Sequence, residues 1–300
     1  MKITSSLIQA SSSALKGIPY LGPWYIQMRL RRQHPVEWAL IHNRHHNENL
    51  HVSILHFSVN KSATQYVKSL LGRVGTENGL TPAHLLGYAF DSDLPFFDHL
   101  SAEEFQKYKY VFHPRGYVYS NFGGAIEGFP GMEQYRSVLM VRDPRDVLTS
   151  LYYSTAYSHS LPDPGGNKQG DFISKREHTR RISVDEFVLE NAEAERRIYQ
   201  RYTDLMMRKQ PEPYLTRYEE MTHDFDTWFT RLLDYCQLHV SEDLKKALYE
   251  EAVNIRPTVE DIHAHVRQGK PGDHKTKLRH ETIEKLDTIF SQVLKDFDYA

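Results

Sequence analysis

The chain has 300 residues, of which 40% are hydrophobic, enough for one large domain or two small ones. Its 37 lysines and arginines nearly balance its 39 aspartates and glutamates, which argues against a surface that coats nucleic acid and against an acidic tail. No run reaches the roughly 20 apolar residues of a membrane helix, and residues 1–30 lack the apolar core of a secretory signal. We therefore expect a cytoplasmic protein with no membrane span and no nucleic-acid partner.

The single cysteine, Cys236, lies within an apolar helical pattern. One cysteine excludes an internal disulfide and a cysteine-based metal cluster, and it fits a reducing compartment. We expect Cys236 to be a buried structural thiol.

Hydrophobic patterning predicts strands and helices that alternate along the chain. In the first half it predicts a strand at 51–59, a turn and helix at 60–73, a helix start at Thr81-Pro82, and strands at 108–112 and 137–141. In the second half it predicts a helix beyond Pro144, a mobile or functional polar segment at 158–181 and a capped helix at 183–209. After these it predicts a strand at 214–218, helices near 222–238 and 241–253, a basic loop at 267–277 and a final helix from about 280.

This alternation indicates an α/β fold with a mainly parallel central sheet flanked by helices on both faces. Residues 1–50 are expected to form an N-terminal arm or lid that packs on the main domain. Residues 51–300 are expected to form that domain.

The segment from Val138 to Tyr153, VLMVRDPRDVLTSLYY, is the most informative part of the chain. An apolar strand delivers Arg142 at its carboxyl end, and the helix that follows carries Ser150 eight residues later. A guanidinium fork and a hydroxyl can then converge on one phosphate group. Ligands of open α/β sheets bind at this edge, beyond the carboxyl ends of the strands.

A second phosphate-binding candidate is the turn NKSATQY at residues 60–66, between the first strand and its helix. Backbone amides at a helix start attract anions, and Lys61 adds a positive charge. Ser62 and Thr64 add hydroxyl donors. A nucleoside-triphosphate P-loop needs glycines where this chain has Leu55 and Asn60, so that interpretation fails.

Both segments resemble motifs of the sulfotransferases that use 3′-phosphoadenosine-5′-phosphosulfate (PAPS). The run RDPRDVLTSLYY resembles the motif whose Arg and Ser hold the 3′-phosphate of the donor, here Arg142 and Ser150. The turn resembles the family's 5′-phosphosulfate loop, usually Lys-Ser-Gly-Thr-Thr-Trp. Position by position, Lys61, Ser62 and Thr64 match, while Ala63 replaces Gly, Gln65 replaces Thr, and Tyr66 replaces Trp with an aromatic face that can stack on adenine.

Three more segments resemble the family's motifs in the same order. His113 occupies the place of the catalytic histidine, although Val111 stands where the family has lysine. Tyr218 matches the tyrosine near the adenine. The last segment, Arg267, Gln268 and Gly269, resembles the motif that closes over the 3′-phosphate; Gln268 departs from lysine, and the next residue, Lys270, can restore the charge.

The resemblance covers residues 51–300 and implies a sulfotransferase fold similar to that of the P-loop kinases. It implies transfer of a sulfuryl group from PAPS to a hydroxyl or amine of a small-molecule acceptor, with 3′-phosphoadenosine-5′-phosphate (PAP) as product and no metal. His113 would be the general base and Lys61 would stabilise the leaving oxygen. Should His113 fail in that role, Glu127 or Asp98 becomes the candidate.

The family's dimer motif survives only as Lys275 and Glu284, so we expect a monomer or a weak dimer. Two alternatives stay open at this point. One is a P-loop-type kinase, and the other is a non-catalytic PAPS- or PAP-binding protein, which the substitutions at Ala63, Val111 and Gln268 favour.

Overall fold

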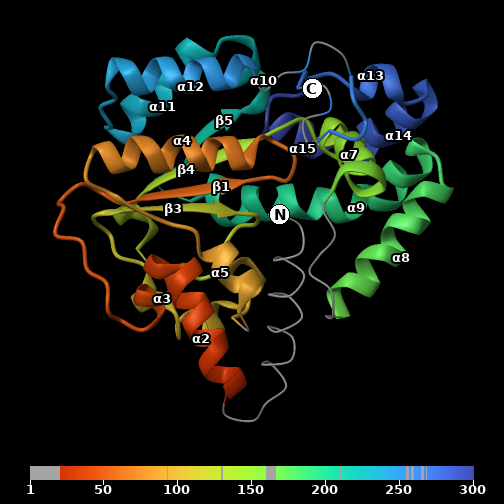
Figure 1. Cartoon of the computed structure of the whole chain (residues 1–300). Coiled ribbons are helices and arrows are strands. Elements are labelled where there is room, and N and C mark those ends of the chain that lie inside the picture. The colour runs from red at the N-terminus through yellow and green to blue at the C-terminus, as the bar shows by residue number, and fades with distance from the viewer. Residues whose placement is uncertain are drawn as a thin grey trace, which may run out of the picture.

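The computed structural model describes residues 21–92, 94–129, 131–159, 167–209, 211–254, 257, 260–264, 267 and 269–300. A five-stranded sheet forms its centre, with every neighbouring pair parallel and the order β2-β3-β1-β4-β5 (Figure 1). The strands are β1 (Ile54–Ser58), β2 (Thr81–Ala83), β3 (Tyr117–Phe122), β4 (Arg136–Val141) and β5 (Tyr214–Arg217). The expected α/β fold with a parallel sheet is confirmed.

Helices cover both faces of this sheet. One face packs against α4 (Thr64–Glu77), α11 (Phe225–Cys236) and α12 (Glu242–Asn254). The other packs against α9 (Val184–Tyr202), on which lie α7 (Pro144–Tyr153), α14 (His280–Ile289) and α15 (Ser291–Asp296). Because each face is covered, β1 is buried along its whole length, including its polar residues His56 and Ser58.

The remaining elements lie around this core. They are α8 (Asn167–Arg181), α10 (Tyr218–His223), α13 (His274–Lys277), the π-helical turns η4 (Ser154–Ser158) and η5 (Thr203–Met207), and the short 3₁₀ turn η3 (Met132–Gln134). The predicted capping box of α9 is present: the Ser183 hydroxyl accepts from the Glu186 N–H, and Glu186 accepts from the Ser183 N–H. Cys236 is fully buried as predicted, and burial raises the pKa of its thiol to about 12.

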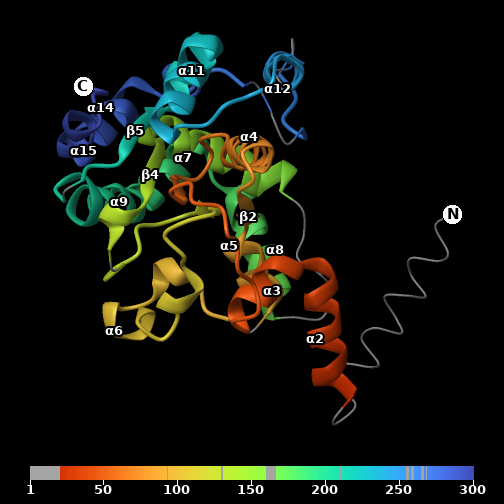
Figure 2. The ribbon, with the colours of Figure 1, turned by 90° about the vertical axis from the view of Figure 1, so that its left-hand side faces the viewer.

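A group of short helices lies beyond the β2 edge of the sheet (Figure 2). It contains α2 (Leu21–Gln33), α3 (Pro35–Ile41), α5 (Leu85–Asp91), η1 (Phe97–His99), α6 (Ala102–Phe105) and η2 (Lys109–Val111). The buried carboxylate of Glu37 on α3 accepts a hydrogen bond of 2.5 Å from the His84 N–H. Part of the expected N-terminal arm thus contacts the main fold, while residues 1–20 lie outside the described residues and the boundary at residue 50 stays a prediction.

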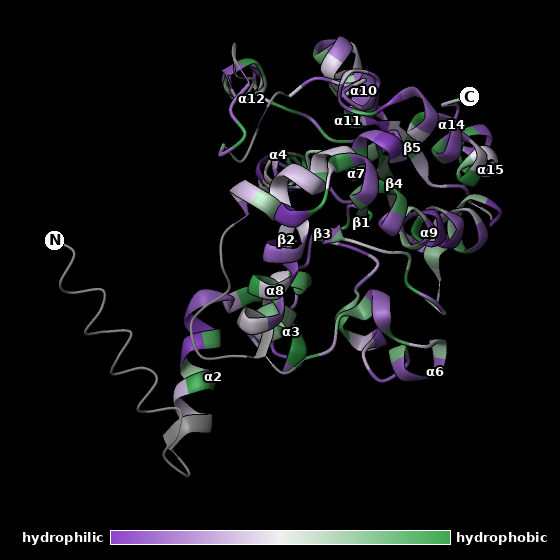
Figure 3. Ribbon diagram, turned by 90° about the vertical axis from the view of Figure 1, so that its right-hand side faces the viewer, coloured by the Kyte–Doolittle hydropathy of each residue, from purple (hydrophilic) through white to green (hydrophobic). Residues whose placement is uncertain are grey.

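Hydrophilic and hydrophobic residues lie side by side on α2 (Figure 3). Trp24 and Met28 on this helix are 62% and 47% exposed. No helix among the described residues combines the length and the apolar character needed to cross a bilayer.

Two sequence predictions are wrong in this region. The run 108–112 is not a strand: Lys109–Val111 is a 3₁₀ turn, whose Val111 is buried against other aromatic and aliphatic side chains, and the strand begins at Tyr117. Burial of a tight corner produces the same apolar run as a strand.

The Thr81-Pro82 pair starts no helix, because it lies in the edge strand β2, which pairs with β3. A proline is tolerated there because an edge strand leaves one side without ladder bonds.

Much of the polar segment 158–181 is helix α8, while residues 160–166 lie outside the described residues.

Candidate nucleotide-binding site

A cavity of about 520 Å³ opens beyond the carboxyl ends of β1, β3, β4 and β5. It lies at the edge of the sheet where open α/β folds bind their ligands. Most of the residues predicted from sequence line it together: Lys61, Ala63, Thr64, Gln65, Tyr66, Arg142, Ser150, Tyr218, Arg267 and Gly269. Lys270 lines it as well, whereas Gln268 lies outside the described residues.

The loop between β1 and α4 is held in shape by its own hydroxyl groups. The Ser58 hydroxyl lies 2.8 Å from both the Ser62 and the Thr64 hydroxyls, and Ser62 donates to the Val59 carbonyl at 2.7 Å. Ser62 is fully buried behind the loop and does not line the cavity. Its side chain therefore shapes the loop instead of meeting a ligand, which differs from the direct contact predicted for it.

Two residues of this loop have left-handed backbone conformations. Lys61 has a φ of 63° and Ala63, at the N-terminus of α4, has a φ of 61°. A residue with a Cβ atom pays about 1–2 kcal/mol for this conformation. Glycine at position 63 would avoid that strain, so the substitution of Ala for the family's Gly is a local cost that the fold tolerates.

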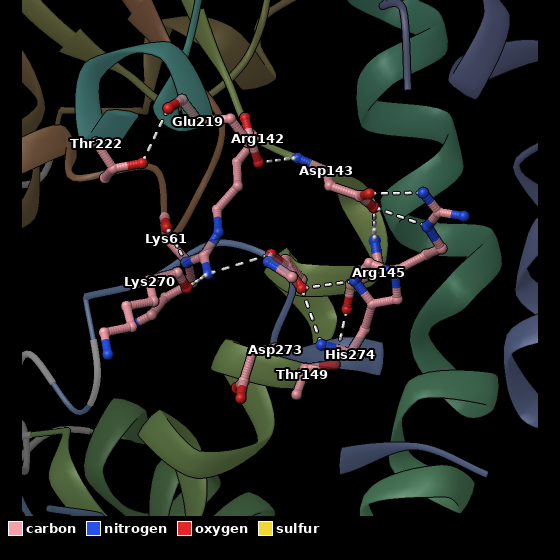
Figure 4. A network of polar contacts seen from close by, with 12 residues as sticks. Lys61, Arg142, Asp143, Arg145, Thr149, Glu219, Thr222, Lys270, Asp273 and His274 are labelled. Atoms are coloured by element: carbon pink, nitrogen blue, oxygen red, sulfur yellow. Dashed lines mark hydrogen bonds and ion pairs between the residues drawn. The ribbon is translucent and has the colours of Figure 1, made fainter. Parts of the chain in front are cut away.

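Arg142 connects the loop to the rest of the site (Figure 4). Its guanidinium donates to the Lys61 carbonyl at 2.9 Å and to the Lys270 carbonyl at 3.4 Å, and lies 4.4 Å from the centre of the Tyr218 ring. The residue is only 6% exposed, and its Nε has no hydrogen-bond partner among the described residues. A buried guanidinium with an unused donor at the cavity wall is suited to an anionic ligand.

Asp146 lies one helical turn beyond Arg142 and is completely buried. It lies 3.6 Å from the Arg142 guanidinium and accepts from the Gly272 N–H at 2.6 Å, the His274 N–H at 2.9 Å and the His274 ring at 2.6 Å. Burial alone would raise the pKa of Asp146, but the His274 hydrogen bonds and the Arg142 charge outweigh it and hold the pKa at about 2. Asp146 thereby ties the segment 269–274 over the cavity.

The cavity has an excess of positive charge. Five cationic side chains line it, and among its described lining residues there is no carboxylate: the five are Lys61, Arg142, Lys175, Arg267 and Lys270. Burial, followed by the charges of Arg142 and Arg267, lowers the pKa of Lys61 to about 8. Cations held this close repel one another, so a bound polyanion would relieve the repulsion.

Arg267 is positioned from the side facing away from the cavity. It forms ion pairs with Glu260 and Asp273, and its guanidinium lies 4.2 Å from the centre of the Tyr153 ring. The next described residue, Gly269, has a φ of 65°, a conformation that suits glycine. The described residues contain no group of three or more His, Cys, Asp or Glu side chains arranged to hold a metal ion.

Aromatic side chains form the wall near β5 and α4. The Tyr66 hydroxyl donates to the Leu248 carbonyl at 2.8 Å, which fixes the orientation of its ring at the cavity. Tyr218 lines the cavity beside Met221. These positions fit the aromatic roles predicted for Tyr66 and Tyr218 near an adenine, which stay predictions.

The opposite end of the cavity is formed by β3, α5, the end of α7 and α8. Here the register between β1 and β3 shifts, because Phe57 pairs with Phe122 and skips Asn121, whose φ is 75°. This bulge lies among the cavity-lining residues, as bulges beside binding sites often do. The other lining residues at this end include Leu86, Gly123, Leu151, Thr155, His159, Phe172 and Lys175.

Helix α8 is fastened to this end by two arginines. Arg176 donates to the Thr155 carbonyl at 3.0 Å and to the His159 carbonyl, and Arg180 donates to the Ala156 carbonyl at 2.7 Å. Carbonyls at the end of a helix lack internal partners, so cationic side chains stabilise them. The anchoring brings Phe172 and Lys175 to the cavity.

His113 lies away from this cavity, so the structure does not support the prediction that it is the general base. It precedes β3, and the next residue, Pro114, accepts a hydrogen bond from the Ser53 N–H, just before β1 begins. Because β1 and β3 run parallel, the start of β3 and the loop after β1 lie at opposite ends of the strands. The His113 ring instead stacks on Tyr117 with 5.2 Å between ring centres, and it is not among the lining residues.

The sequence reasoning missed Asn121 and Gly123 at the end of β3, and Phe172 and Lys175 on α8. A signal for the first pair was present, because the Gly-Gly pair in the run Asn-Phe-Gly-Gly at 121–124 marks a turn. For α8 the sequence indicated only that the polar segment 158–181 is mobile or functional, and it did not single out Phe172 or Lys175.

A sulfotransferase domain family model matches residues 132–298, more than half of the chain. The chain belongs to the sulfotransferase domain family. The matched region contains Arg142, Ser150, Tyr218 and Arg267, which confirms the resemblance drawn from these motifs. The turn at 60–66 lies outside the matched region, so its role as a phosphate loop stays a prediction.

A solved sulfotransferase structure shares this fold. Mouse sulfotransferase SULT7A1 complexed with PAP is 12% identical, with a TM-score of 0.54 and coverage of 88% of this chain and 91% of that one. Retinol dehydratase in a complex with retinol and PAP is 15% identical, with a TM-score of 0.46 and coverage of 88% and 87%. A search of curated proteins found no match. The sulfotransferase fold expected from the sequence is therefore confirmed.

We predict that Asp146→Ala lowers the free energy of unfolding by about 3–5 kcal/mol, because the buried Arg142 loses its carboxylate partner. Asp287→Ala is the matched control, since it removes a half-exposed partner of Arg145 and should cost below about 1 kcal/mol. Urea denaturation of both variants measures the difference.

The Asp146–Arg142 pair also predicts how the free energy of unfolding changes with pH. The pKa of Asp146 is lowered in the folded state, so its stabilisation is present above the unfolded pKa of about 3.9 and is lost as the pH falls toward 2. Asp146→Asn should remove that part of the acid sensitivity. Equal stability of wild type and Asp146→Ala would show that this pair does not hold the site together.

We predict that Ala63→Gly is tolerated despite the flexibility that glycine adds to the unfolded chain. Relief of the left-handed strain at φ 61° should offset that entropy, for a net change within about 1 kcal/mol. Ala63→Val is the control and should destabilise the loop, because a β-branched residue is strained there. Thermal denaturation of the two variants decides the matter, and similar melting temperatures would contradict the assigned conformation.

Proposed function

We propose that this protein transfers a sulfuryl group from PAPS to a hydroxyl or amine of a small-molecule acceptor. The observation that carries the proposal is the cavity lined by five cations and no carboxylate among its described lining residues. PAPS presents phosphate groups at both ends of an adenosine, and two separate cationic loops are available to meet them. The PAP-bound SULT7A1, which shares the fold, supports the same ligand.

In this proposal each end of the nucleotide meets its own set of residues. Arg142 and Ser150 hold the 3′-phosphate, with Arg267 and Gly269 closing over it. Lys61, Thr64 and the amides at the start of α4 hold the 5′-phosphosulfate, which gains from the unpaired N–H groups of a 14-residue helix. Tyr66 and Tyr218 flank the adenine.

Catalysis in this arrangement depends on positioning and on charge. The sulfuryl group lies between the leaving phosphate oxygen and the attacking acceptor atom, so holding both in line supplies much of the acceleration. Lys61 stabilises the negative charge that grows on the leaving oxygen, inside a partly desolvated site where such an interaction is strong. The end of the cavity beside Leu86, Leu151 and Phe172 receives the acceptor.

The non-catalytic PAP-binding protein is the second candidate, and a specific observation favours it. The polar side chain at the bulge of β3 is an amide, Asn121, which cannot take a proton, and His113 lies away from the cavity. Transfer of label from PAPS to an acceptor separates the two. A P-loop-type kinase is disfavoured, because the loop lacks that motif's glycines.

We expect Ser150→Ala to weaken PAP binding about tenfold to hundredfold, the loss typical of a hydrogen bond to a charged group. Binding of 5′-AMP, which has no 3′-phosphate, should be unchanged, so it serves as the matched control ligand. Calorimetry with both nucleotides measures this difference in binding. Transfer of ³⁵S from labelled PAPS to a panel of phenols, alcohols and amines measures the activity. Failure of the wild type to bind PAP would refute the proposed function.

The lowered pKa of Lys61 predicts how binding changes with pH. Free Lys61 loses its proton near pH 8, and a bound phosphate favours the charged form, so PAP affinity should fall as the pH rises above about 8, by at most about tenfold per pH unit. Lys61→Arg stays charged and should make the affinity independent of pH in that range. Calorimetry across this pH range tests both, and a flat wild-type profile would exclude Lys61 as a phosphate ligand.

A further inference from the structure

The proposed site lacks an evident group to accept the acceptor's proton. An un-ionised hydroxyl must lose its proton as it attacks sulfur, and a positioned base usually speeds such a step about 10²–10⁴-fold. Among the described residues that line the cavity, His159 alone has a side chain that commonly acts as a base near neutral pH. Its ring stacks on Phe172 of α8, with 5.4 Å between ring centres, at the end of η4.

Asp98 lies directly behind the cavity wall at the end of β3. It belongs to η1, and its Oδ2 lies 3.5 Å from the point where a Cβ atom on Gly123 would stand. Gly123 itself lines the cavity. At Gly124 the corresponding distance to Oδ2 is 3.1 Å. Because both residues are glycines, neither places a side chain between the carboxylate and the cavity.

The surroundings of Asp98 keep it partly shielded from water but polar. The Gly124 N–H donates to it, and the charged or titratable groups that face it are His99 on η1 and Arg201 and Tyr202 on α9. Burial raises the pKa of Asp98, against the opposing effects of His99 and Arg201. A carboxylate with a raised pKa is a stronger base than one in water.

Glu127 is the other acidic residue near this loop, and it is placed differently. It is exposed and lies 3.9 Å from Arg201 in an ion pair on the surface. Arg201 therefore contacts Glu127 and also acts electrostatically on Asp98, so the two acids share one neighbour. Asp98 lies beside the cavity-lining Gly123, whereas Glu127 pairs with Arg201 at the surface, which makes Glu127 a close control.

We propose that Asp98 is the general base of the transfer and takes the acceptor's proton beside Gly123, where no side chain stands between the Asp98 carboxylate and the cavity. This inference rests on the proposed function and names the group that performs one of its steps. The acceptor oxygen forms its bond to sulfur while the bond from sulfur to the phosphate oxygen breaks. The acceptor's proton passes to the Asp98 carboxylate, and PAP leaves with the electron pair on the oxygen that Lys61 stabilises.

The test compares two acceptors that differ in their need for a base. Phenol is un-ionised at mildly alkaline pH, whereas 4-nitrophenol is already largely ionised and has no proton to give up. We expect Asp98→Asn to slow ³⁵S transfer from PAPS to phenol at least hundredfold and to change transfer to 4-nitrophenol less than threefold. Where neither phenol is a substrate, the same comparison is made on hydrolysis of PAPS, since water also gives up a proton.

Three further variants make the result specific. Gly123→Ala places a methyl group 3.5 Å from Asp98 Oδ2, an ordinary contact distance, at a residue without a positive φ, so it should fold normally and slow transfer to phenol. Glu127→Gln should leave both reactions unchanged. His159→Gln tests the rival base, and a loss confined to phenol in this variant would overturn the proposal.

Binding separates failure of this inference from failure of the proposed function. Asp98→Asn should bind PAP as tightly as the wild type, because no phosphate contact is assigned to Asp98. Equal rates for wild type and Asp98→Asn with phenol, or equal losses with both acceptors, would reject Asp98 as the base while leaving sulfuryl transfer intact. A wild type that does not bind PAP would reject both.

Discussion

The site depends on one buried cation, Arg142, and on the carboxylate that holds it. Its guanidinium contacts the backbone of the β1–α4 loop and of the segment at 269–274, two parts of the chain separated by more than 200 residues. Asp146, completely buried, binds the same guanidinium and the backbone of Gly272 and His274. Burying a charge without a partner costs free energy, so Arg142 and Asp146 stay paired. The same pair therefore holds the two loops of the proposed site in a fixed relation and positions the cation between them.

This arrangement leaves the cavity with more positive than negative charge on its lining side chains. The carboxylates that balance its cations, Asp146, Asp273 and Glu260, lie behind them, and the described lining residues contribute none. Burial, together with the charges of Arg142 and Arg267, lowers the pKa of Lys61 to about 8, and a bound anion would raise this pKa again. The protein stores electrostatic repulsion in the free site, and that repulsion favours a ligand with several negative charges.

The residues predicted to bind phosphate line one cavity, and the sequence could place them together because their positions follow from local geometry. A buried strand of the 137–141 type must end at the sheet edge, and eight residues of turn and helix fix where Ser150 lies relative to Arg142. His113 does not line the cavity, because its predicted place depended on a strand at 108–112, where a buried 3₁₀ corner has the same apolar pattern. The true end of β3 carries a bulge at Asn121, and the approach of Asp98 to Gly123 joins segments whose proximity no local pattern encodes.

The crystal structure of the protein with PAP bound tests the central claim most directly. The account predicts that the 3′-phosphate lies between Arg142 and Ser150, and that the 5′-phosphate lies within hydrogen-bonding distance of Lys61 and the amides at the start of α4. Both phosphates would then occupy the cavity described by these side chains. A nucleotide bound with either phosphate away from Lys61 or Arg142 would contradict the account.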